Sequence, residues 1–322
     1  MPRTRRVVCV GGGTGMSTML RGLKEYTDEI TAIVTVADNG GSSGVLRKEM
    51  NMLPPGDIRN CLLALAETEP IMQEVFQYRF QEGSLQGQNM GNLFLAALTD
   101  IYGSFERAVE KANEVLAVKG QVLPVTTENV QLKATYEDGT TITGEHEIVY
   151  MNKVLRKKIQ KVELLPESPK AYTRAIEALK KADIIVLGPG SLYTSLLPNL
   201  LVDGISEAIR ESLATVVYVG NIMTQPGETD NYTLAMHLES IERCLGKGVI
   251  EYIIANRTIL DKSVEEHYFE DGAIVVRNDL EDQRYYSNVI ETDFAILSPN
   301  HRYIRHDTKK LAQIIMDLKG GD

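Results

Sequence analysis

Residues 6–15, RVVCVGGGTG, decide the fold class of this chain. The apolar run Val7–Val10 is typical of a strand buried on both faces, and a helical pattern follows from about Met16 to Glu25. Glycine lets the backbone approach a phosphate closely, and the helix points its positive end at the same place. The loop is therefore either a phosphate site or a tight strand–helix turn. It is not the strict G-x-G-x-x-G fingerprint, because Met16 replaces the third glycine, and it is not a Walker loop.

Similar apolar runs recur along the chain and alternate with helical patterns. This alternation is typical of a parallel sheet with crossover helices. We therefore predict an α/β fold with a mostly parallel sheet and helices on both faces. The further strands are expected at residues 30–36, 184–187, 215–219 and 252–255, and the later helices at 172–181 and 308–319.

Two segments depart from this rhythm. A helical segment, about 57–117, carries apolar residues at helical spacing and is expected to form helices at 57–67, 71–80, 91–101 and 104–116. A small β-rich insertion is predicted at about 121–166, because residues 130–136 and 140–150 alternate around Asp138-Gly139, a strong hairpin signal. We expect residues 1–322 to form one domain that includes both segments.

Composition restricts the class of protein. Lys and Arg total 34 against 44 Asp and Glu, and the net charge of −10 argues against a nucleic-acid partner. The three cysteines form no C-x-x-C pair, as expected for reduced thiols in the cytoplasm. No stretch is long and apolar enough for a membrane span. Homo-oligomerisation through a strand edge or the insertion stays open.

Small polar loops follow every predicted strand. The carboxyl ends of parallel strands meet at one edge of a sheet, where open α/β sheets bind their ligands. Five converging loops therefore predict a ligand site more strongly than any one of them. The loops are GGGTG at 11–15, ADNGGSSG at 37–44, GPGS at 188–191, GNIMTQPGE at 220–228 and NRT at 256–258.

Several polar residues in these loops have two interpretations. Asp38 lies where such folds place a carboxylate on a ribose hydroxyl, but aspartate is also common in turns. Asp57 either caps a helix or faces a metal or a phosphate-bound water, and Asn92 is either a cap or an amide aimed into the cleft. Arg257, just past a strand end, suits a diphosphate. The sequence contains no G-x-S-x-G or H-E-x-x-H motif, and its histidines lack metal-ligand spacing.

Taken together, the loop sequences resemble the YvcK family of gluconeogenesis factors, which is related to the 2-phospho-L-lactate transferases. The resemblance runs in order from about Arg6 to His306. The motifs that carry it are GGGTG (11–15), TVADNGGSSG (35–44), PPGDIRN (54–60), GNL (91–93), GPGSLYTS (188–195) and NIMTQPGET (221–229).

This resemblance implies a Rossmann-like fold and a bacterial cytoplasmic protein that binds UDP-sugars such as UDP-N-acetylglucosamine. It also implies a regulatory role in cell shape and wall integrity during gluconeogenic growth. Thr14 and its neighbouring glycines would hold phosphate, and Asn199 and Arg257 would contact the nucleotide or sugar. The predicted ligand-binding residues are Gly11, Gly12, Gly13, Thr14, Gly15, Asp38, Asn39, Gly41, Ser42, Asp57, Asn60, Asn92, Gly188, Gly190, Ser191, Asn199, Asn221, Thr224 and Arg257.

The transferase branch implies an alternative. Those enzymes use a guanosine diphosphate-linked donor and a divalent metal such as Mg²⁺, with Asp38 and Asp57 as the candidate metal ligands and catalytic residues here. Their second loop carries Asp-Asp, whereas this chain has Asp38-Asn39, and the loss of one carboxylate weakens a metal site. We therefore expect a binding protein rather than an enzyme. A third hypothesis is NAD binding, which the fold and Asp38 would tolerate.

Overall fold

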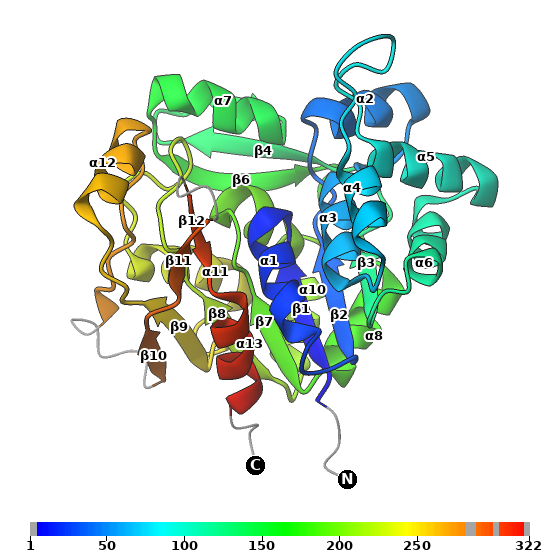
Figure 1. Ribbon diagram of the computed structural model, residues 1–322. Coiled ribbons are helices and arrows are strands. Elements are labelled where there is room, and N and C mark those ends of the chain that lie inside the picture. The colour runs from blue at the N-terminus through cyan, green and yellow to red at the C-terminus, as the bar shows by residue number, and fades with distance from the viewer. Residues whose placement is uncertain (1–4, 281–287, 299–302, 319–322) are drawn as a thin grey trace.

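The computed structural model describes residues 5–280, 288–298 and 303–318. Its centre is a seven-stranded sheet with the order β10-β9-β8-β7-β1-β2-β3, in which every pair of neighbouring strands is parallel (Figure 1). The strands are β1 (Val7–Gly11), β2 (Ile30–Val34), β3 (Gln121–Pro124), β7 (Ile184–Leu187), β8 (Thr215–Val219), β9 (Tyr252–Asn256) and β10 (Val289–Thr292).

The five strands expected from apolar runs are all present. Strands β1, β2, β7 and β8 are buried along their whole length, which explains their near-continuous apolar sequences. From β1 the chain continues to β2 and β3 on one side, and it later continues from β7 to β8 and β9 on the other. Strand order therefore reverses between β1 and β7, and such a reversal is where this class of fold binds its ligands.

Helices cover both faces of the sheet, as predicted (Figure 1). One group contains α1 (Gly13–Leu23), α3 (Gly56–Leu65) and α13 (Thr308–Asp317), and the other contains α8 (Thr173–Lys181), α10 (Ile205–Glu211) and α11 (Leu234–Leu245). The helical segment continues after α3 with α4 (Pro70–Gln77), α5 (Met90–Tyr102) and α6 (Phe105–Val115), and the chain then enters β3. None of the helices in the described ranges is long and apolar enough to cross a membrane.

The insertion forms a second, antiparallel sheet with the order β5-β4-β6 and one helix, α7. The hairpin at Asp138-Gly139 is confirmed, with Gly139 at φ +82°. The strand predicted at 140–150 is wrong beyond Thr143, because Gly144 at φ +107° ends the strand and a helix follows with Ile148 and Asn152 buried one turn apart. The elements are β4 (Gln131–Tyr136), β5 (Thr141–Thr143), α7 (Glu145–Leu155) and β6 (Ile159–Leu165), whereas 121–124 belongs to the main sheet.

Some short elements were not expected from the sequence. The serine- and glycine-rich second loop becomes α2 (Gly41–Met50) after four residues. The other elements for which no range was predicted are α10, α11, β10, the π-helical turn η1 (Leu192–Leu196), α9 (Leu197–Leu200), α12 (Lys262–Glu270), β11 (Ala295–Leu297) and β12 (Ile304–His306). Figure 1 shows α7 lying across the carboxyl-end edge of the main sheet, with α12 beside it.

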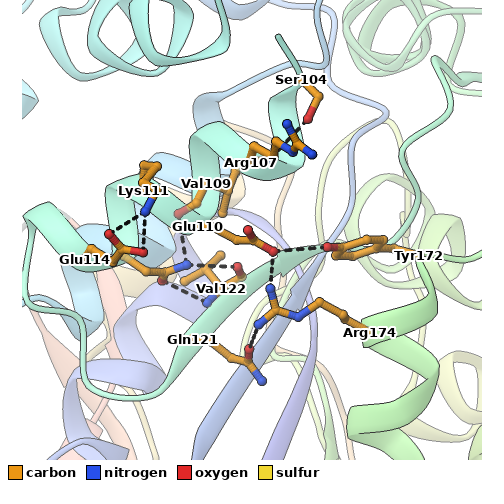
Figure 2. A network of polar contacts seen from close by, with 11 residues as sticks. Ser104, Arg107, Val109, Glu110, Lys111, Glu114, Gln121, Val122, Tyr172 and Arg174 are labelled. Atoms are coloured by element: carbon orange, nitrogen blue, oxygen red, sulfur yellow. Dashed lines mark hydrogen bonds and ion pairs between the residues drawn. The ribbon is translucent and has the colours of Figure 1, made fainter. Parts of the chain in front are cut away.

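A polar network covers the outer edge at β3 (Figure 2). Arg174 of α8 forms an ion pair with Glu110 of α6, and its other guanidinium nitrogen donates to Gln121 of β3 at 2.8 Å. The network therefore ties a helix of each flank to the edge strand. Edge strands covered in this way are protected from pairing with other chains.

We expect Arg174→Ala to lower the free energy of unfolding by about 0.5 kcal/mol, because both partners are partly exposed and exposed ion pairs contribute little. Urea denaturation at low and high salt measures this change, which should shrink as salt screens the pair. A loss above about 2 kcal/mol would show that the network, rather than sheet burial, holds this edge.

Candidate functional site

The loops after β1 and β7 interlock where the strand order reverses. A Cβ atom built on Gly15 would lie 2.7 Å from the carbonyl oxygen of Pro189, and one on Gly190 would lie 3.3 Å from the carbonyl oxygen of Gly12. Side chains at either position would push the two loops apart. Helix α1 begins at Gly13 within the first loop, so its N-terminal dipole points into the space beside them.

A cavity of about 740 Å³ opens over these loops. Its floor is made of backbone and small residues, which is the chemistry of a phosphate site. Among the residues that the structure describes, Lys153 of α7 and Arg305 of β12 line it with positive charge, and Tyr268 and Tyr303 line it with phenol rings. Predicted site residues that line the cavity are Gly12, Gly13, Thr14, Gly15, Gly190, Ser191, Asn221 and Thr224.

The aromatic side of the cavity is built by the C-terminal segment. The Tyr268 hydroxyl accepts a hydrogen bond from the Ile304 backbone N–H at 2.7 Å, which ties α12 to β12. The Arg305 guanidinium lies 5.4 Å from the centre of the Tyr303 ring. Aromatic rings beside cations suit a flat base and a phosphate group, respectively.

Several predicted ligand residues hold the loops in place. Asn199 is fully buried beneath the first loop, where its amide donates to the carbonyl oxygens of Gly11 at 2.9 Å and Ser195 at 2.7 Å. The Asn221 amide donates to the carbonyl oxygen of Gly190 at 2.9 Å, and the Thr224 hydroxyl accepts from the Ile274 N–H at 2.9 Å. Asn199 has no exposed surface, so it can act on a ligand only through the loop that it supports.

Two further predicted glycines, Gly11 and Gly188, are not among the lining residues, whereas Ser191 lines the cavity. Gly11 is the buried last residue of β1, and Gly188 turns the chain after β7 at φ +78°. The Ser191 hydroxyl accepts from the Gln225 amide at 2.6 Å, which joins the GPGS loop to the NIMTQPGET loop. The loops after β1, β7 and β8 therefore form one continuous wall.

An acidic cluster, Asp38 and Asp57, lies on the other side of Gly12. A Cβ on Gly12 would lie 2.7 Å from a carboxylate oxygen of Asp57, and one on Gly56 would lie 3.1 Å from a carboxylate oxygen of Asp38. The fold thus brings Asp38 and Asp57 together beside the glycine loop. Asp38 also accepts a hydrogen bond from the Gly40 N–H at 2.8 Å.

Burial raises the pKa of three carboxyl groups, those of Asp57, Glu145 and Glu228, and the charges of neighbouring carboxylates add to each shift. Burial, and then the charge of Asp38, raise the pKa of Asp57 to about 7, against the Gly13 N–H that donates to it and the charge of Arg59. Burial, and then Asp38, Glu228 and Asp57, raise the pKa of Glu145 to about 8. Burial also raises the pKa of Glu228 to about 7, although the Thr194 hydroxyl and two backbone N–H groups oppose the shift. Three carboxyl groups therefore titrate near neutral pH.

Asp38 and Asp57 stay candidate metal ligands. Within residues 5–280, 288–298 and 303–318, no group of three or more His, Cys, Asp or Glu side chains is placed to hold a metal ion. Asp38 and Asp57 supply two carboxylates, and each accepts a backbone N–H. Mg²⁺ is usually bound by one or two carboxylates together with waters and substrate phosphates, so a metal at this pair stays a prediction.

The second loop contacts the insertion and the helical segment. The Asn39 amide donates to Glu147 at 2.7 Å and its oxygen accepts from the His146 N–H at 2.8 Å, both on α7. The hydroxyl of buried Ser42 donates to Gln88 at 2.7 Å and accepts from the Asn92 amide at 3.2 Å. Gly41, at φ +46°, begins α2.

The remaining predicted polar residues form side-chain pairs. Asn60 and Asn92 both accept from Arg59, at 2.7 and 2.9 Å. Arg257 lies at the end of β9 with its side chain 62% exposed and pairs with Asp293 at 3.4 Å. Arg257 does not line the cavity and is separated from the glycine loop by β8 and β7.

Among the lining residues that were not predicted as site residues, Lys153, Tyr268, Tyr303 and Arg305 carry a cation or a tyrosine ring. Lys153 belongs to the predicted β-rich insertion at about 121–166, beyond the strand expected at 140–150, and no motif marks it. Tyr268 and Arg305 lie on short elements that the apolar pattern did not reveal. The one sequence signal that the C-terminal segment contributes to the site is the extent of the resemblance, which reaches His306.

Comparison with known proteins identifies the family. The model of the family described as 2-phospho-L-lactate transferase CofD matches residues 7–295. A gluconeogenesis factor of Bacillus subtilis is 43% identical over 319 residues, which are 99% of each chain. The chain belongs to the gluconeogenesis factor group of the CofD family.

Further members of this group agree with the architecture. The gluconeogenesis factor of Halalkalibacterium halodurans is 44% identical over 98% of this chain and 97% of its own. A crystal structure of a UPF0052 family member from Bacillus halodurans, 44% identical, covers 97% of this chain and 100% of its own with a TM-score of 0.91. The predicted family and the predicted Rossmann-like fold are both confirmed.

Proposed function

We propose that this CofD-family member is a regulatory protein that binds a UDP-sugar, such as UDP-N-acetylglucosamine, in the cavity over the glycine loop. The observation that carries the proposal is the cavity itself. Its floor is the glycine loop with the N-terminus of α1, and its walls carry Lys153, Arg305 and two tyrosines. A volume of about 740 Å³ lies in the range of small-molecule sites.

Each part of such a ligand has a chemically matched wall. The diphosphate would rest on the backbone N–H groups at Gly13–Gly15, close to the helix dipole. The base would lie against Tyr268 or Tyr303, because aromatic side chains stack on planar rings. The acidic cluster of Asp38 and Asp57 would accept hydrogen bonds from the sugar hydroxyls.

The names of the relatives support a role in gluconeogenic growth. Two relatives at 43% and 44% identity carry the name gluconeogenesis factor. We propose that ligand occupancy reports the supply of a wall precursor during growth on gluconeogenic carbon sources, and that cell shape and wall integrity depend on this signal.

Isothermal titration of the purified protein with UDP-N-acetylglucosamine tests the proposal, with GDP and NAD as competing ligands and with and without Mg²⁺. We expect UDP-selective binding in the micromolar range, with no change in the ligand after prolonged incubation. No heat with any UDP compound, together with Mg²⁺-dependent binding of GDP or binding of NAD, would contradict it.

A second candidate function is transfer of a phospholactyl group from a guanosine diphosphate-linked donor. The family description and the proximity of Asp38 and Asp57 favour it. Transfer activity that disappears in Asp57→Ala while nucleotide binding survives would establish it. We prefer the binding protein because Asn39, at the position of a second carboxylate in the transferases, is bound to α7.

A further inference from the structure

The inserted helix α7 supplies one wall of the cavity. Its Lys153 lines the cavity together with the glycine loop, although the two are 138 residues or more apart in sequence. The backbone N–H group of Lys153 lies 3.0 Å from a Cβ built on Gly227, at φ +87°. Helix α7 therefore packs closely on the loop after β8, and a side chain at Gly227 would separate them.

Neighbouring contacts fix the position of Lys153 on this helix. The amide of buried Asn152 donates to the carbonyl oxygens of Gly227 and Lys157, both at 2.7 Å. At the other end of α7, Asn39 accepts the His146 N–H and donates to Glu147. Because both ends of the helix are attached to loops at the carboxyl edge, the lysine is presented to the cavity from a defined position.

Lys153 adds a positive charge to a cavity wall that also carries carboxylates. In the described part of the chain Arg305 is the other arginine or lysine that lines the cavity, whereas Glu270 and Asp271 line it with negative charge. A nucleoside diphosphate brings about two negative charges, which one arginine does not neutralise. A lysine ammonium is a point charge on a flexible stem and binds phosphate oxygens well.

Resting on the proposed function, we infer that Lys153 contacts the diphosphate of the bound nucleotide, so that the insertion is part of the ligand site. The contact with Lys153 would distinguish ligands by their number of phosphates and would not distinguish one base from another. The bound diphosphate would connect α7 to the glycine loop, in addition to the contacts that Asn39 and Asn152 already make.

The experiment compares the affinities of wild type, Lys153→Ala and Lys153→Arg for uridine, UMP, UDP and UDP-N-acetylglucosamine by isothermal titration. We expect Lys153→Ala to weaken binding of the two diphosphates by about tenfold, as for loss of one charge-assisted hydrogen bond, and to leave uridine unchanged. Lys153→Arg should stay within about threefold of wild type because it keeps the charge. The matched control is Lys161→Ala on β6, where Lys161 pairs with Glu163 and is 57% exposed.

Hydrogen exchange of α7 amides provides a second readout. We expect UDP-N-acetylglucosamine to slow exchange in α7 of wild type and of Lys161→Ala, but much less in Lys153→Ala at equal occupancy. Wild-type affinity for diphosphates in Lys153→Ala, or an equal loss for uridine and UDP, would overturn the inference. Thermal melting of each variant separates these outcomes from misfolding.

The proposed function and this inference fail in different ways. If wild type binds no UDP compound, the proposed function is wrong, and inorganic pyrophosphate becomes the probe for Lys153. Pyrophosphate binding that is lost in Lys153→Ala and kept in Lys161→Ala would still support the lysine contact. Absence of pyrophosphate binding to wild type would overturn it.

Discussion

Gly15→Ala is expected to weaken UDP-sugar binding by about 100-fold or more, the largest effect of any single substitution at the site. The new Cβ would lie 2.7 Å from the Pro189 carbonyl oxygen, and both atoms belong to backbone that is held by neighbouring strands. The loops after β1 and β7 must then separate, and the phosphate-binding N–H groups move with them. Overpacking of this kind also costs about 1–3 kcal/mol of stability.

Gly40→Ala provides the matched control. Its Cβ would meet the nearest atoms, on Asp38 and His146, at 3.5 Å, which is ordinary contact, and Gly40 does not line the cavity. Titration and thermal melting of both variants should show a loss of affinity for Gly15→Ala alone. Normal affinity in a folded Gly15→Ala protein would place the ligand away from the glycine loop.

Glu145→Gln is expected to stabilise the protein at alkaline pH. The pKa of Glu145 is about 8 in the folded protein, against 4.5 for the ordinary side chain, because burial and the charges of Asp38, Glu228 and Asp57 disfavour its ionised form. The folded state therefore binds more protons than the unfolded state between about pH 4.5 and 8. Wild-type stability must fall as pH rises through this window, and a neutral amide removes the contribution of this group.

We expect the glutamine variant to gain roughly 2 kcal/mol at pH 8.5, after allowance for solvent screening of a half-buried group, and little at pH 5. Urea unfolding at both pH values measures the difference. Glu163→Gln is the control, since its carboxylate pairs with Lys161 and its pKa is lowered, mainly by that lysine. Equal stability of Glu145→Gln and wild type at pH 8.5 would show that Glu145 is solvated.

The parts of the fold that could be predicted from the sequence are those with a regular pattern of apolar residues. Strands β7 and β8 match their apolar runs residue for residue, because a strand buried on both faces leaves an uninterrupted signal. Parallel pairing then dictates that the loops converge, and the structure brings Gly12, Gly190 and Asn221 to one cavity.

The predictions that were wrong or missing share a different cause. Residues 140–150 alternate like a strand, but Gly144 interrupts them and burial of Ile148 and Asn152 selects a helix. Tertiary contacts overrode the local pattern there, as they often do in short segments. Lys153 could not be found because a lone lysine carries no pattern, and its place in the cavity depends on how α7 packs against Gly227. Asn199 stays a predicted ligand residue, and no sequence signal shows that its side chain is buried under the first loop.

The attachment of α7 at both ends has a mechanical consequence. Asn39 follows β2 and Gly227 follows β8, so the helix bridges the two halves of the sheet that diverge from β1 and β7. Residues 146 and 152, which carry the attachments, lie about 9 Å apart along a helix that rises 1.5 Å per residue. The helix acts as a spacer of fixed length between the loops that follow β2 and β8.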